Sequence, residues 1–108
     1  MSVETSASFV VDLKEKLPAI PAESIVSRTF YGDEQVKAVL FGFAPGQELS
    51  EHTAATPVIL HILQGEAELT LGGQTQAAGP GTWVHLPARL PHTLVARTEV
   101  VMLLLLLK

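Results

Sequence analysis

Cysteine is missing from this chain of 108 residues. Its absence excludes a disulfide framework, thiolate metal ligands and a cysteine nucleophile. Positive charge is sparse as well, because seven Lys and Arg residues are scattered from Lys14 to Lys108 and the formal net charge is −4. The chain therefore lacks the clustered basic residues that indicate a nucleic-acid partner.

Long apolar segments and targeting signals are also missing. The longest apolar run, Val100–Leu107, falls well short of the roughly 20 residues that a membrane-spanning helix needs, so it predicts a buried strand and no membrane partner. The N-terminal residues lack the positive start and apolar stretch of a secretory signal, which makes a cytoplasmic location the expectation. No Gly-rich phosphate loop, nucleophile elbow or serine triad is recognisable.

What the chain does contain is short apolar runs between glycine and proline residues, a pattern typical of an all-β sandwich or barrel. Apolar residues make up 47% of the sequence and charged residues 17%, which predicts a single folded domain over residues 1–108. Residues 1–23 are expected to form an N-terminal strand and connector, and residues 24–107 the barrel. The expected strands are Phe9–Leu13, Ile25–Phe30, Gln35–Phe43, Val58–Gln64, Glu66–Leu71, Trp83–Leu86, His92–Ala96 and Val100–Leu107.

Turn chemistry supports antiparallel neighbours. Pro45-Gly46 suits a type II turn, and Gly72-Gly73 suits a tight hairpin. Between these turns, Ala67, Leu69 and Leu71 alternate with polar residues, so one face of that strand lines a core. Helix is expected only as about one turn near Lys14.

Two segments with fixed internal spacing resemble the paired motifs of the cupin superfamily. The first contains Gly46, His52 and Gly65, and the second contains Gly81, Pro87 and His92. Both segments occur in order with a hairpin between them, so the resemblance covers about half of the chain. It implies a double-stranded β-helix, the jelly-roll-like cupin barrel.

The resemblance also implies candidate ligands inside the barrel. Metal-binding cupins use two His and one Glu from the first motif and one His from the second, and only His52 and His92 remain here. Ala54 and Val58 occupy the other two ligand positions. Metal sites generally need at least three protein ligands. Two alternatives therefore stay open: the barrel binds one divalent transition metal (Fe, Mn, Ni, Cu or Zn), or it binds no metal.

Three further residues are candidates for the site or its surroundings. If the path from Ile59 to Leu71 has no bulge, odd positions share a face, which would turn His61 toward the barrel as a third imidazole ligand. Arg89, in the loop before His92, is a candidate for an anionic ligand at the rim. His85 shares a face with Trp83, and the sequence does not say which face that is.

Three functions follow as hypotheses. The first is a binding module whose barrel holds a small-molecule ligand with His52, His92 and His61 as polar anchors. The second is a metal-dependent enzyme of the oxygenase or isomerase type, which uses those three imidazoles. The third is a structural barrel without a site.

The C-terminal strand also predicts self-association. Val100–Leu107 has no polar side chain on either face, so both faces must be covered. One face can pack into the barrel, while the other is expected to contact a second copy of the chain in a homodimer. Coverage by the N-terminal segment Phe9–Leu13 is the alternative within one chain.

Overall fold

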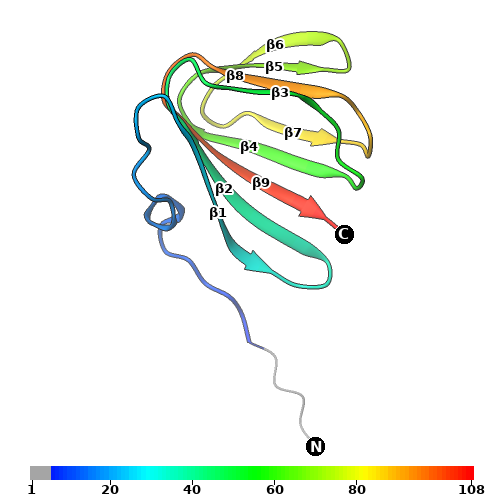
Figure 1. Cartoon of the computed structure of the whole chain (residues 1–108). Coiled ribbons are helices and arrows are strands. Elements are labelled where there is room, and N and C mark those ends of the chain that lie inside the picture. Colours follow the sequence, from blue (N-terminus) through cyan, green and yellow to red (C-terminus); the bar gives the residue numbers. More distant parts are fainter. Residues whose placement is uncertain (1–5) are drawn as a thin grey trace, which may run out of the picture.

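The computed structural model describes residues 6–108, and their regular secondary structure is almost wholly strand (Figure 1). Residues 1–5 of the expected N-terminal segment lie outside this range. In chain order the elements are the 3-10 turn η1 (Leu13–Lys16) and the strands β1 (Ile25–Gly32), β2 (Val36–Phe43), β3 (Glu48–His52), β4 (Val58–Gln64), β5 (Ala67–Leu71), β6 (Gln74–Ala78), β7 (Trp83–Leu86), β8 (His92–Ala96) and β9 (Val100–Leu107).

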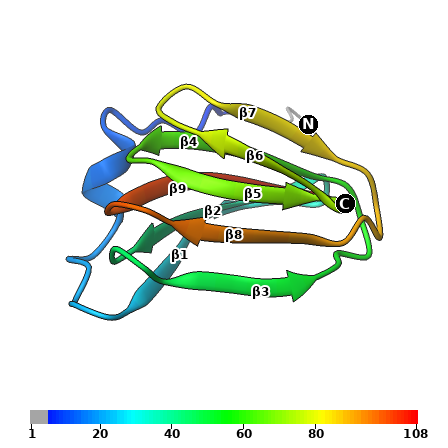
Figure 2. The ribbon, with the colours of Figure 1, turned by 90° about the horizontal axis from the view of Figure 1, so that it is seen from above.

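The strands form two facing antiparallel sheets (Figure 2). One sheet has five strands in the order β1-β2-β9-β4-β7, and the other has four in the order β3-β8-β5-β6. Sequence neighbours such as β7 and β8 lie in different sheets, which is the crossing connectivity of a double-stranded β-helix. The predicted fold class is confirmed, and within residues 6–108 helix is limited to the one turn around Lys14, as expected.

Three elements differ from the sequence-based expectation. Phe9–Leu13 was expected as a strand, but it pairs with neither sheet, and Asp12 instead caps η1 by accepting a hydrogen bond from the Lys14 amide. The strands β3 and β6 were not predicted. Both lie at the edges of the four-stranded sheet and are mostly exposed, so neither contains the apolar run by which the other strands were found.

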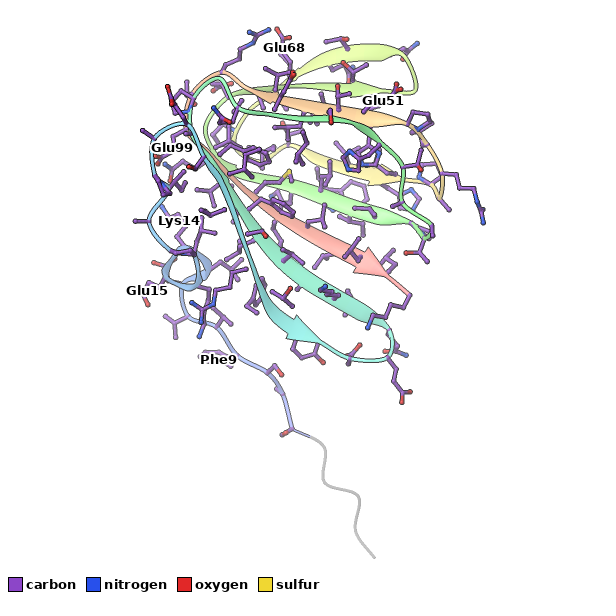
Figure 3. The ribbon with its side chains drawn as sticks, in the orientation of Figure 1. Phe9, Lys14, Glu15, Glu51, Glu68 and Glu99 are labelled. Carbon is purple, nitrogen blue, oxygen red and sulfur yellow. The ribbon has the colours of Figure 1, made fainter. Side chains whose placement is uncertain are left out.

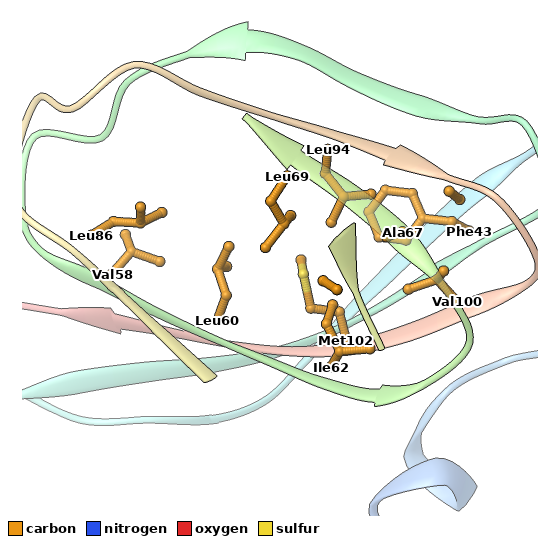
Figure 4. Close-up of a cluster of buried hydrophobic side chains, with 12 residues drawn as sticks. Phe43, Val58, Leu60, Ile62, Ala67, Leu69, Leu86, Leu94, Val100 and Met102 are labelled. Carbon is orange, nitrogen blue, oxygen red and sulfur yellow. The ribbon is translucent and has the colours of Figure 1, made fainter. Parts of the chain in front are cut away.

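The core lies between the two sheets and follows strict alternation along the strands (Figure 4). On β4 the inward residues are Val58, Leu60 and Ile62, and on β9 they include Val100 and Met102. Across from them, the four-stranded sheet contributes a further set of side chains. That set is Ala67, Leu69, Ala78, Leu94 and Ala96.

The opposite side of the five-stranded sheet, here called the outer face, is apolar as well. Leu103 and Leu105 of β9 point to it, and next to them lies a groove of about 620 Å³. The second wall of this groove is the N-terminal arm, defined as residues 8–20, which runs along the outer face. Ile20 of the arm packs so closely on Gly42 that any larger residue there would clash. The arm thus covers part of the outer face, as the single-chain alternative required.

A bulge in β4 between Ile62 and Gln64 changes which residues face inward, and directly after it Gly65 separates β4 from β5. Its φ of +91° is in the region that favours glycine, and a Cβ at this position would collide with the Glu99 carbonyl oxygen. Before Gly65 the even-numbered residues face the core, and after it the odd-numbered Ala67 and Leu69 do. This reversal decides where His61 lies.

The β1–β2 turn is organised by Asp33. Its carboxylate accepts hydrogen bonds from the Tyr31 hydroxyl at 2.6 Å and from the amides of Gln35 and Val36. These bonds, led by that from Tyr31, hold the pKa of Asp33 below its ordinary value, and the pKa of Tyr31 is raised in return. The ionised carboxylate of Asp33 therefore stabilises the β1–β2 turn through these hydrogen bonds.

Candidate functional site: a histidine pair in the barrel

His52 and His92, called the histidine pair below, are brought together by strand register. β3 and β8 are antiparallel neighbours, and the register places His52 directly opposite His92. Their ring centroids are 4.1 Å apart, and the ring planes are inclined by 62°. Two residues forty positions apart in sequence thus present their imidazoles to one place.

In both rings Nδ1 forms a hydrogen bond to a backbone carbonyl oxygen. His52 Nδ1 lies 2.8 Å from the Ser50 carbonyl oxygen, and His92 Nδ1 lies 2.8 Å from the Leu90 carbonyl oxygen. Because a carbonyl can only accept, each Nδ1 carries the hydrogen and donates it. In the neutral ring this leaves a lone pair on Nε2. Such backbone anchoring fixes the orientation and tautomer of an imidazole and is the usual outer-shell arrangement behind a ligand nitrogen.

A small pocket of about 20 Å³ lies against the pair inside the barrel. That volume holds about one water molecule or one ion. His92 is 8% exposed, whereas His52 is exposed to solvent, so the pair connects the interior with the barrel mouth. The pocket is lined by Leu49, His52, Leu60, His92, Thr93, Leu94, Met102 and Leu104.

The other predicted site residues do not join the pair. His61 lies on the outer face, opposite Trp83 of β7 and Leu103 of β9, because a bulge between Ile62 and Gln64 changes the parity of the strand path. His85 is on the same outer face, opposite Ile59. Arg89 has a φ of +68° in the loop before β8, where its amide donates to the Ala54 carbonyl, and its side chain is exposed.

The residues present do not fit the four-ligand metal site of metal-binding cupins. Val58 is 2% exposed and belongs to the apolar core, and Ala54 has no donor atom in its side chain. Among residues 6–108, no group of three or more His, Cys, Asp or Glu side chains is arranged to hold a metal ion. Of the four ligand positions that the motifs imply, only the two of the histidine pair carry an imidazole.

Met102 is a site residue that the sequence reasoning missed. It is 1% exposed, and its side chain lines the same pocket as the two imidazoles. The alternation along Val100–Leu107 was a usable signal, since it separates Val100, Met102 and Leu104 from the outward residues. The sequence does not say which of these two faces is inside, because neither face of that strand carries a polar side chain.

Two facing antiparallel sheets with crossing connections and a histidine pair at the mouth define a small barrel of the double-stranded β-helix type. A family model described as the cupin domain matches residues 39–107, so the chain belongs to the cupin family, as the motifs indicated. No curated protein sequence matches the chain.

Solved structures agree with this membership. The chain is similar to a cupin superfamily protein from Desulfitobacterium hafniense DCB-2, with 25% identity, a TM-score of 0.83 and coverage of 94% of this chain and 93% of that one. It is also similar to a conserved protein of unknown function from Streptococcus pyogenes, with 29% identity, a TM-score of 0.82 and coverage of 100% and 96%.

A salicylate 1,2-dioxygenase variant from Pseudoaminobacter salicylatoxidans in complex with gentisate shares the fold. Its identity is 17%, its TM-score is 0.74, and the match covers 86% of this chain and 28% of that one. At this level of identity the likeness concerns the fold alone. No helix among residues 6–108 is long and apolar enough to cross a bilayer.

Proposed function

We propose that the protein is a ligand-binding cupin whose ligand is held by the histidine pair. The observation that carries this proposal is the anchoring of both Nδ1 atoms to backbone carbonyls at 2.8 Å. It leaves two Nε2 lone pairs beside one pocket whose other walls are mostly apolar. A few convergent polar groups in an apolar surround are typical of small-molecule sites.

The size of the pocket decides how much of the ligand enters. About 20 Å³ admits a single atom or small group between the rings. The remainder of a larger ligand would lie over the mouth, where His52 is exposed. A ligand group that donates hydrogen bonds, or that accepts a lone pair, matches the two Nε2 atoms.

The enzyme hypothesis receives less support. A three-histidine metal site would need His61, and His61 lies on the outer face opposite Trp83. The structural-barrel hypothesis is favoured by the filled interior, but it gives no reason for two anchored imidazoles beside a pocket. We therefore place ligand binding first and keep the metal-dependent oxygenase or isomerase as the second candidate.

Three measurements on protein purified without a nickel column test this function. Long-range 1H–15N spectra are expected to show the Nδ1–H tautomer for both His52 and His92, and elemental analysis is expected to show divalent metals far below one equivalent. Screening of hydroxyl- and amine-bearing fragments should yield compounds that shift both Nε2 signals together. His61→Ala is the matched control, since the His61 ring lies on the outer face of the five-stranded sheet, away from the histidine pair.

The proposal would be contradicted if neither Nε2 signal responded to any fragment while both rings carried the hydrogen on Nε2. Near-stoichiometric iron, manganese, nickel or zinc that is lost on His52→Ala would instead support the metal-dependent enzyme. A cytoplasmic location stays a prediction from the sequence.

We further propose that the protein is a homodimer that associates through the outer face. The arm leaves this face partly open, and Phe9 and Val11 of the arm are themselves 84% and 87% exposed. Figure 3 shows Phe9 on the arm before η1. Trp83, on the same face, is 60% exposed. Large apolar side chains gathered on one surface in this way indicate an interface, and two-fold pairing is the commonest assembly.

Neighbouring leucines of β9 provide the test. Leu105 lines the outer groove, whereas Leu104 packs against the core. Leu105→Asp is expected to give a folded monomer, while Leu104→Asp should destabilise the fold by about 3 kcal/mol or more because it buries a carboxylate. Light scattering on the wild type at micromolar concentration checks the proposal, and a mass near 11.6 kDa would refute it.

A further inference from the structure

A protruding tryptophan and an apolar groove occupy different parts of the outer face. Trp83 of the edge strand β7 is 60% exposed and lies opposite the outward His61. The groove of about 620 Å³ lies over β9, β2 and β1, with Leu103 and Ala38 on its sheet side and the arm as its other wall. Tryptophan is highly buried on average in folded proteins and is enriched among the residues that dominate binding at interfaces. Trp83 is therefore a candidate anchor, and the groove is a candidate recess for it.

The order of the strands places the tryptophan and the groove at matching positions. In the sheet β1-β2-β9-β4-β7, strand β7 lies two strands from β9 and three from β2, which is about 10–14 Å at the usual strand spacing. A two-fold axis that runs parallel to the strands, midway between β4 and β9, exchanges β4 with β9 and β7 with β2. When two outer faces meet across such an axis, each Trp83 lies over the groove of the other copy.

The charge of this surface suits contact with a second copy. In β2, β9, β4 and β7, all within residues 6–108, no outward position holds Asp, Glu, Lys or Arg. Lys37 is the one such residue in these strands, and it alternates with Val36 and Ala38, so it belongs to the opposite side. Because a two-fold axis repeats one surface on both sides, permanent charges there would lie near like charges of the other copy. The absence of such charges at these positions removes that repulsion.

The lining of the groove offers contacts that favour an indole ring. Phe9, Phe30 and Tyr31 are among its lining residues, and aromatic side chains pack favourably on one another. Lys16 of the arm also lines it, and an ammonium group is attracted to the face of an aromatic ring, most strongly to that of Trp. A volume of about 620 Å³ lies in the range of pockets that hold molecules larger than an indole. The groove thus has room for the tryptophan side chain.

From these observations we infer that Trp83 of each copy inserts into the groove of the other, between its arm and its sheet. The inference rests on the proposed homodimer and specifies which side chain and which recess hold the two copies together. The same axis sets Ile59 of β4 against the partner's Leu105, so apolar side chains also fill the centre of the interface. It accounts as well for the exposed Phe9, which borders the groove that the partner's Trp83 enters.

Truncation of the tryptophan is the first test. Trp83→Ala should weaken the dimer at least about 100-fold, because one interface tryptophan is lost on each side. His85→Ala is the matched control, since His85 is the next outward position of the same strand and its side chain does not enter the groove. This control should change the dissociation constant only a few-fold. Analytical ultracentrifugation over a range of concentrations measures both constants, and circular dichroism checks that each variant is folded.

A mixture of two defective variants tests the reciprocal insertion itself. Ala38→Phe fills the groove and keeps Trp83, whereas Trp83→Ala keeps the groove. Each variant alone should be monomeric at micromolar concentration, while an equimolar mixture should form heterodimers, because these contain one intact pair of tryptophan and groove. Isotope-filtered NMR of labelled Ala38→Phe with unlabelled Trp83→Ala should show contacts from the Trp83 ring to leucine methyls on β9 of the partner. Val36→Phe, at the less buried end of β2, takes the place of Ala38→Phe if the latter does not fold.

Three results would overturn the inference while the homodimer stands. They are a Trp83→Ala dimer as tight as that of the wild type, a mixture that stays monomeric although both variants are folded, and contacts from the Trp83 ring to the partner's β7 instead of its β9. A wild type that is monomeric at micromolar concentration would overturn the proposed homodimer and this inference with it.

Discussion

Gly65→Ala is expected to lower the free energy of unfolding by about 3 kcal/mol or more, a large share of the roughly 5–15 kcal/mol of a typical domain. Two effects combine at this position. A φ of +91° is strained for any residue with a Cβ, and that Cβ would collide with the Glu99 carbonyl oxygen, which is backbone and cannot move aside cheaply. Urea unfolding monitored by circular dichroism measures the loss.

Gly73→Ala separates the two effects. Gly73 has a nearly identical φ of +89°, but a Cβ there would meet no other atom within 4 Å. This control should therefore report only the backbone strain, about 1–3 kcal/mol. Equal losses in the two variants would show that the close approach of Glu99 does not add to the cost at Gly65.

Val58→Glu is expected to cost about 3 kcal/mol or more at neutral pH. Val58 is 2% exposed and lies in the apolar core, so the substitution buries a carboxylate among apolar side chains. Burial should raise the pKa of the introduced carboxyl above its unfolded value. Stability lost at neutral pH should then return as the pH falls through this raised pKa, because the neutral acid is cheaper to bury.

Val58→Gln is the matched control, since it has nearly the same shape and cannot ionise. The stabilities of the two variants should converge in acid and separate as the pH rises. Adding Ala54→His to Val58→Glu completes the ligand set of metal-binding cupins, so Zn²⁺ should then restore stability by binding only the folded state. Equal stability of Val58→Glu and the wild type at pH 7 without metal would contradict the apolar character of this position.

The sequence contained enough to predict the fold and the centre of the site. Apolar runs between turn residues located Val58–Gln64, Trp83–Leu86, His92–Ala96 and Val100–Leu107 at their observed bounds. The spacing of the two motifs singled out His52 and His92, which the structure brings to a ring-centroid distance of 4.1 Å. These features are local, and local patterns of alternation and turn chemistry are what a single sequence records well.

Features that depend on contacts between distant segments were not predictable in the same way. The face on which His61 lies depends on the bulge between Ile62 and Gln64, which forms in the pairing of β4 with the distant strand β9. The strands β3 and β6 form by pairing at sheet edges, without an apolar run of their own. Met102 reaches the pocket only because β9 lies between β2 and β4 in the five-stranded sheet.

The exposed position of Trp83 makes the protein a convenient subject for optical spectroscopy. It is the single tryptophan of the chain, and it stands on the outer face opposite His61 rather than among the buried side chains. Its emission therefore reports the polarity of whatever covers that side of the molecule. Events at the histidine pair take place on the other side of the sheet, so the two processes can be followed separately in one sample.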